Sequence, residues 1–245
     1  MQTRSFFKPF FFLISFALFS CESNQPPSPE KAKEIISTRT LGLAYLEEGQ
    51  LSEAESTFVR LTDLAPDEAL GFANLGLVQM RLGRYDEAEK NIKQALELDA
   101  VNPDVRLMLA DIYELTDRAD AAQQELEASL QQSPDHANSI YSLSQIHLNS
   151  GDSGLQKAEP LLTKLLTLRP GNVSIRMQLI EISLRLQKPD SAAAHLEALH
   201  QQIPDLPKES QVYFDEALAA ARNGDADAAL RPAVIVHNFL KVTPI

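Results

Sequence analysis

The chain has 245 residues and a formal net charge of −12, because 34 Asp and Glu outnumber 22 Lys and Arg. Proteins that bind nucleic acids use cations to displace counterions from the phosphates, so this charge argues against a nucleic-acid partner. The chain has one cysteine, Cys21, which excludes a disulfide within the chain and a metal site built from several thiolates.

Residues 1–20 have the composition of a secretory signal peptide. Arg4 and Lys8 lie in a short basic segment, and the Phe- and Leu-rich stretch Pro9–Phe19 follows. This stretch is shorter than the roughly 20 apolar residues that a membrane-spanning helix needs. Removal of residues 1–20 leaves 20 Lys and Arg against 34 Asp and Glu, a net charge of −14.

Cys21 directly follows the sequence Leu18-Phe19-Ser20. This arrangement resembles the lipobox of bacterial lipoproteins, in which cleavage precedes the cysteine and a diacylglycerol is attached to its thiol. The resemblance implies a lipid anchor on Cys21. Because Glu22 and not Asp follows the cysteine, it also implies the periplasmic face of the outer membrane. An ordinary signal peptide followed by a chance cysteine is the alternative interpretation.

Residues 21–34 are predicted to form a tether. The segment Glu22–Glu30 contains three prolines and no large apolar residue, a composition typical of a stiff, extended linker. We expect the folded part of the chain to begin at residue 35 and to run to residue 245.

The sequence then repeats itself. Five closing residues are separated by 34, 34, 36 and 34 residues, and they are Pro66, Ala100, Pro134, Pro170 and Pro204. A fixed period of this length is typical of stacked supersecondary units. The predicted units span residues 35–68, 69–102, 103–136, 137–172, 173–206 and 210–243. The one longer separation reflects a two-residue insertion between Gly151 and Ala158.

Each unit has apolar residues at helical spacing on both sides of a turn, which predicts two amphipathic helices. In the second unit, Leu75-Gly76, Gly83–Ala88, Ala95-Leu96 and Leu98-Asp99 match the signature of the tetratricopeptide repeat (TPR) family, which the chain therefore resembles. The resemblance implies an all-α superhelix of about twelve antiparallel helices, in five good repeats and one degenerate repeat. In the fifth unit Gln187 stands where a turn glycine is expected.

No residues are predicted to be catalytic or to bind a metal or a cofactor. The five histidines form no HExxH motif and no i,i+4 pair, and the chain has no glycine-rich phosphate-binding motif and no GxSxG. We therefore expect a protein that is not an enzyme.

In a TPR superhelix the first helix of each unit lines a concave groove, so the resemblance implies that a partner protein or peptide binds there. Cations, amides and aromatic residues on that surface suit peptide recognition. The predicted groove residues are Arg39, Asn74, Leu77, Arg81, Asp111, Tyr141, Gln145, Asn149, Met177 and Arg185.

The predicted function is a membrane-anchored scaffold for protein–protein interaction in the bacterial cell envelope. Two alternatives remain open: a pilotin-like or NlpI-like assembly factor for an envelope complex, or the truncated front part of a larger TPR-propeller protein or enzyme. The sequence 237–245 ends without a polar capping helix, which repeat stacks normally need. We therefore expect a shortened relative, or a last helix covered by a partner.

Overall fold

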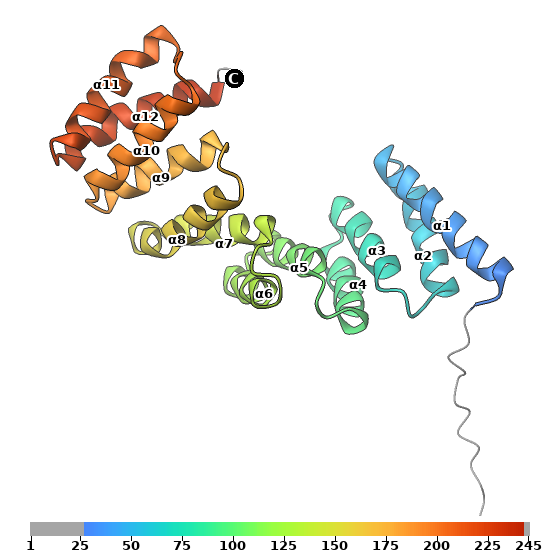
Figure 1. Ribbon diagram of the computed structural model, residues 1–245. Coiled ribbons are helices and arrows are strands. Elements are labelled where there is room, and N and C mark those ends of the chain that lie inside the picture. The colour runs from blue at the N-terminus through green and yellow to red at the C-terminus, as the bar shows by residue number, and fades with distance from the viewer. Residues whose placement is uncertain (1–26, 243–245) are drawn as a thin grey trace, which may run out of the picture.

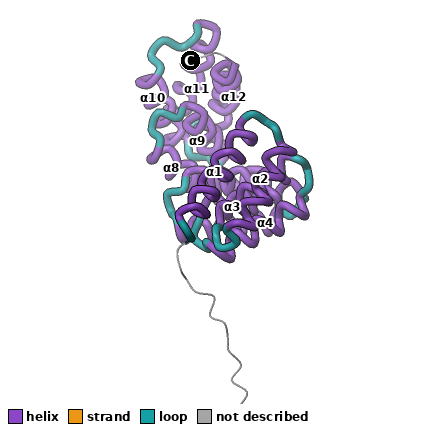
Figure 2. Tube along the Cα trace, turned by 90° about the vertical axis from the view of Figure 1, so that its right-hand side faces the viewer, coloured by secondary structure: helices purple, strands orange, loops and turns teal. Residues whose placement is uncertain are grey.

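A computed structural model describes residues 27–242, and within that range the chain forms twelve α-helices and no strand (Figures 1 and 2). The all-α prediction is therefore confirmed. The helices are α1 (Pro29–Glu47), α2 (Leu51–Leu64), α3 (Ala69–Arg81), α4 (Tyr85–Leu98), α5 (Pro103–Leu115), α6 (Ala119–Gln132), α7 (Ala137–Asn149), α8 (Asp152–Leu168), α9 (Val173–Arg185), α10 (Pro189–Gln202), α11 (Lys208–Arg222) and α12 (Ala226–Val242). The predicted signal peptide and Cys21 lie outside the described residues.

The first helix begins earlier than the tether prediction allows. α1 starts at Pro29, so the last residues of the predicted tether, 29–34, are helical. Ser28 accepts a hydrogen bond from the Lys31 backbone N–H and caps the helix, and a proline at the first helical position costs no hydrogen bond. The prolines that suggested an extended linker thus include one that opens a helix.

Consecutive helices form pairs, and the second helix of each pair packs on the first helix of the next (Figure 1). The pairs follow one another along an elongated, curved stack. Glycines allow the helices of a pair to approach closely. A Cβ added at Gly42 would lie 2.8 Å from the Phe58 ring, and one added at Gly76 would lie 2.7 Å from Ile92.

The turn inside each pair requires a left-handed backbone conformation. Four of the six turns use a glycine, at Gly49, Gly83, Gly151 and Gly224, with φ between 71° and 77°. The third and fifth turns use Asp117 (φ 57°) and Gln187 (φ 56°) at the same place. Gln187 therefore adopts the backbone conformation of the missing glycine, which costs a residue with a Cβ about 1–2 kcal/mol.

Ion pairs with one sequence separation join neighbouring pairs of helices. Arg84 with Glu55, Arg118 with Glu89 and Lys188 with Glu159 each span 29 residues. In each case a cation at a turn between two helices reaches back to a carboxylate on the second helix of the preceding unit. The Arg118 guanidinium also lies 4.4 Å from the centre of the Tyr113 ring, a favourable cation–π distance.

The last helix departs from a simple stack. α12 packs on α11 and also on α9, the first helix of the preceding unit (Figure 1). Ala233, Val236 and Leu240 of α12 share one core cluster with Met177 and Leu184 of α9. The chain's own α9 therefore covers this side of α12, and a partner over the last helix stays a prediction.

Candidate functional site

The first helix of each unit has one face that is turned away from the second helices. α5, for example, packs on α4 and α6 through buried residues such as Val105 and Ile112. Its opposite side carries Leu107, Asp111 and Glu114, which are half-buried or exposed. We call this side of α1, α3, α5, α7 and α9 the first-helix face. It is the surface on which the predicted groove residues should lie.

Equivalent residues form a row along this face. The periods of 34 and 36 residues place one residue of each of five units at the same position, namely Leu43, Leu77, Asp111, Gln145 and Glu181. Helix α5 contacts both α3 and α7. Leu77, Asp111 and Gln145 are therefore carried by helices that lie next to one another. The row changes from apolar at α1 and α3 to polar and acidic from α5 onward.

Most of the predicted groove residues are accessible. Asn74, Leu77, Asp111 and Gln145 are half-buried, Asn149 is exposed, and Tyr141 retains 42% of its surface. No hydrogen bond to the Tyr141 hydroxyl occurs among residues 27–242. These side chains leave an apolar and polar surface over α3, α5 and α7 for contact with another molecule.

The three predicted arginines are engaged within the chain. Arg39 pairs with Glu68 at 2.6 Å, and Arg81 donates to the Leu46 carbonyl at 3.1 Å. Arg185 pairs with Asp152 at the start of α8. The Arg81 and Arg185 contacts each join two units, and Arg39 reaches Glu68, the residue that directly precedes α3. The arginines therefore hold neighbouring repeats together in this structure, and a partner would have to share them.

Met177 was wrongly predicted to line the groove. Its side chain is fully buried, because α12 lies across the first-helix face of α9. Leu184 is covered as well, with 1% of its surface exposed. The imidazole of His237 on α12 hydrogen-bonds through Nδ1 to Glu181 Oε1 and completes this cover. The first-helix face is thus closed at α9 and open on α1 to α7.

Two carboxylates at the centre of the open face have no partner. Neither Asp111 nor Glu114 forms a hydrogen bond or ion pair through its side chain within the described part of the chain. Burial raises the pKa of Asp111. Burial also raises the pKa of Glu114, and the charge of Asp111 adds to that effect. Keeping Asp111 and Glu114 both ionised therefore lowers the free energy of unfolding.

Sequence reasoning missed Glu114 and Leu148. Both lie on the open face, and they occupy the repeat position of Leu184, at separations of 70 and 36 residues. Glu114 is also three residues after Asp111, which puts both carboxylates on one side of α5. Extending the repeat register to every position of the first helices identifies them.

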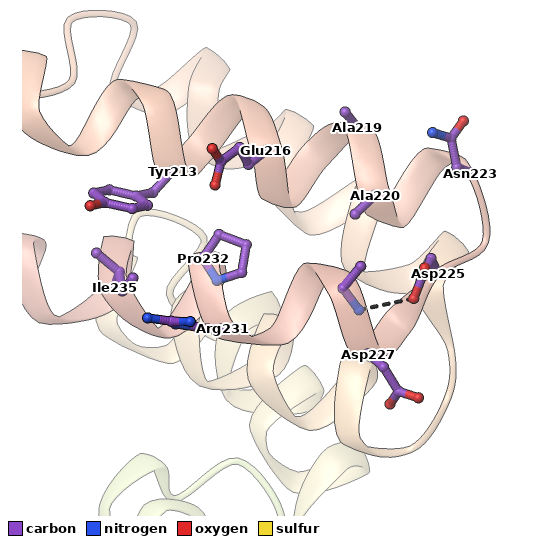
Figure 3. Close-up of a pocket in the computed structure, with 11 residues that line it drawn as sticks. Tyr213, Glu216, Ala219, Ala220, Asn223, Asp225, Asp227, Arg231, Pro232 and Ile235 are labelled. Carbon is purple, nitrogen blue, oxygen red and sulfur yellow. Dashed lines mark hydrogen bonds between the residues drawn. The ribbon is translucent and has the colours of Figure 1, made fainter.

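A surface hollow of about 770 Å³ lies between α11 and α12 (Figure 3). Tyr213 and Glu216 of α11 face Arg231 and Pro232 of α12 across it. Pro232 lacks a backbone N–H and so leaves the last helix with one hydrogen bond fewer on this side. The lining of this hollow includes no histidine, cysteine or serine.

Residues 27–242 hold neither a metal-binding cluster nor a membrane-spanning helix. No group of three or more His, Cys, Asp or Glu in this range is arranged to hold a metal ion. In the same range, every helix is too short or too polar to cross a membrane.

Two models of the tetratricopeptide repeat match the sequence. One matches residues 79–145 and 155–213, and the other matches residues 39–103. The chain belongs to the tetratricopeptide repeat family. The matches agree with the helix pairs, the turn glycines and the close helix contacts at Gly42 and Gly76. A comparison with curated proteins found no match.

Several solved structures share the TPR fold. PilF of Pseudomonas aeruginosa is 17% identical with a TM-score of 0.62, over 87% of this chain and 95% of that one. YrrB, described as a TPR protein with an unusual peptide-binding site, is 16% identical with a TM-score of 0.58, over 76% and 93%. MamA of Desulfovibrio magneticus RS-1 is 20% identical with a TM-score of 0.56, over 71% and 95%. At these identities the similarity establishes the fold alone.

Proposed function

We propose that this protein is a scaffold, anchored in a bacterial cell envelope by lipid on Cys21, which binds a segment of a partner protein on its first-helix face. The contrast between α7 and α9 is the main support. α9 has its face covered by α12, whereas α7 leaves Tyr141 and Leu148 accessible at the equivalent positions. An aromatic residue beside unpaired polar groups is typical of a binding surface.

Family membership supports the same function. TPR stacks present long continuous surfaces, and an interface of about 1,600 Å² is within the reach of several units. YrrB, which shares the fold, is described as having a peptide-binding site. The anchor is supported separately, by the basic and apolar segment that precedes Cys21.

Both parts of the proposal are tested in intact cells. The full-length protein is labelled with radioactive palmitate, and a Cys21→Ala variant is the control. Label that depends on Cys21 and recovery in the membrane fraction support the anchor, whereas equal label on the variant refutes it.

Partners are recovered from detergent extracts with the wild type and with a Tyr141→Ala, Leu148→Ala double variant. We expect at least one protein that the wild type retains and the double variant loses. The identity of that protein distinguishes a general scaffold from an assembly factor for a secretin or a peptidoglycan hydrolase. Equal recovery by both proteins excludes the first-helix face as the binding surface.

A further inference from the structure

The chain itself shows how a helix lies on the first-helix face. α12 places His237 against Glu181, and Ala233, Val236 and Leu240 join the core around Met177 and Leu184. Helix α12 thus supplies His237 as its basic residue. Its apolar residues lie four positions before (Ala233), one position before (Val236) and three positions after (Leu240) that histidine. The face supplies one carboxylate from the row and two apolar side chains.

Comparable side chains lie over α5 and α7, with the carboxylates on α5 and the apolar residues on α7. Tyr141 and Leu148 lie 36 residues before Met177 and Leu184 and take their positions in the repeat. Asp111 lies 70 residues before Glu181, also at an equivalent position. Glu181 meets His237, whereas Asp111 and the nearby Glu114 have no partner of their own within residues 27–242. The surface therefore combines apolar side chains with two unneutralised negative charges.

Neutral side chains at positions 111 and 114 would make the folded protein more stable than the two carboxylates do. A carboxylate that is partly shielded from water and lacks a counter-ion opposes folding when it is ionised. By contrast, the carboxylate of Glu89 in the same stack is paired with Arg118 and Lys93. A positive group brought by another molecule would remove the mismatch at Asp111 and Glu114, and a negative group would increase it.

We infer that the face over α5 and α7 binds an amphipathic helix of the partner protein, with a Lys or Arg placed on Asp111 and Glu114 and flanking apolar residues placed on Tyr141 and Leu148. This inference rests on the proposed function and adds the chemistry of the bound segment. The bound helix would cover α7 as α12 covers α9, but its cation would reach across to α5, because the α7 residue at the position of Glu181 is Gln145. Because α12 already covers α9, the binding surface ends at α7.

The test uses a phage-displayed library of amphipathic helices in which one central position is Lys, Arg, Gln or Glu. The folded protein selects from this library, and so does an Asp111→Asn, Glu114→Gln variant. A third protein, Asp120→Asn, Glu127→Gln, has the same change in charge at exposed positions on α6. Circular dichroism establishes that all three are folded before selection.

We expect the wild type and the α6 variant to enrich Lys and Arg over Glu by about tenfold or more, because like charges in an interface are strongly disfavoured. The Asp111→Asn, Glu114→Gln variant should lose this preference. Three results overturn the inference: no helix binds, the bound helices show no charge preference, or the preference survives in the Asp111→Asn, Glu114→Gln variant. If partner recovery still depends on Tyr141 and Leu148 in any of these cases, only the inference falls and the proposed function stands.

Discussion

His237 of α12 and Glu181 of α9 share a hydrogen bond across 56 residues of sequence, and this contact fixes the last helix over the face of the fifth unit. The His237 side chain is 6% exposed and that of Glu181 is 28% exposed. A contact shielded to this degree contributes more than an ion pair on the open surface. The C-terminal end of the stack is therefore closed by a long-range contact as well as by contacts between neighbouring helices.

Replacing this histidine should loosen α12 locally. We expect His237→Ala to lower the free energy of unfolding by about 1–3 kcal/mol, because Glu181 loses its partner and a core position is emptied. Hydrogen exchange followed by mass spectrometry should show faster exchange in α12 and α9 and unchanged exchange in α1 to α6, since repeat stacks transmit stability mainly between neighbours. The control is Arg222→Ala, which breaks the exposed pair with Glu197 and should cost less than about 1 kcal/mol. Equal effects of the two variants would contradict this account of α12.

The turns offer a stabilising substitution. Asp117 has φ 57° at a turn where four other units have glycine. Asp117→Gly should raise the free energy of unfolding by about 0.5–1 kcal/mol, because glycine adopts this conformation without strain and the gain exceeds the entropy it loses. Urea denaturation measures the change. The reverse substitution, Gly83→Ala, should destabilise the protein by a similar amount, since no atom lies within 4 Å of the added Cβ and only backbone strain is at issue. A stabilising Gly83→Ala would refute this explanation.

The helices and their order could be predicted because the residues that determine each helix pair lie close together in the sequence. The period, the turn glycines and the small residues at Gly42 and Gly76 each act within one helix pair. The position of α12 could not be predicted in this way, since it depends on the hydrogen bond between His237 and Glu181, which belong to different units. That contact buries Met177, which by its repeat position alone belongs on the open face.

The sequence predicted which residues of the candidate site are accessible, but it did not predict the hydrogen bonds and ion pairs of the arginines. The repeat register places Asp111, Tyr141 and Gln145 on the first-helix face, as the structure does. The register does not reveal that Arg39 is paired with Glu68, or that Arg81 reaches the Leu46 carbonyl. Long side chains choose partners among several neighbours, and only the folded stack determines which neighbour is nearest.

The central carboxylate should lower stability while it serves binding. Burial raises the pKa of Asp111, so the native state binds a proton more readily than the unfolded chain does. Asp111→Asn should therefore raise the free energy of unfolding at pH 7. This gain should disappear as the pH falls below the ordinary pKa of an aspartate, where the wild-type side chain is neutral in both states. Denaturation at pH 7 and at pH 3 measures both effects, and a variant less stable than the wild type at pH 7 would contradict this reading of the site.

A half-buried histidine should make the fold sensitive to mild acid. Burial lowers the pKa of His195 on α10, Arg176 lowers it further, and Glu159 opposes them. The unfolded chain then takes up a proton near pH 6.5 that the native protein resists, so the free energy of unfolding should fall as the pH drops from 7 to 5.5. The slope for one proton is at most about 1.4 kcal/mol per pH unit. His195→Gln should reduce the slope, and an unchanged slope would assign the effect to other groups.

The central claim is that the open first-helix face holds a partner, and site-specific photo-crosslinking in intact cells tests it most directly. A benzophenone amino acid replaces Tyr141 or Leu77 on that face, or Thr167 at an exposed position of α8 as the control. The account predicts one discrete crosslinked partner from both face positions and none from Thr167. Crosslinks that are absent from the face, or equally strong from Thr167, would contradict it.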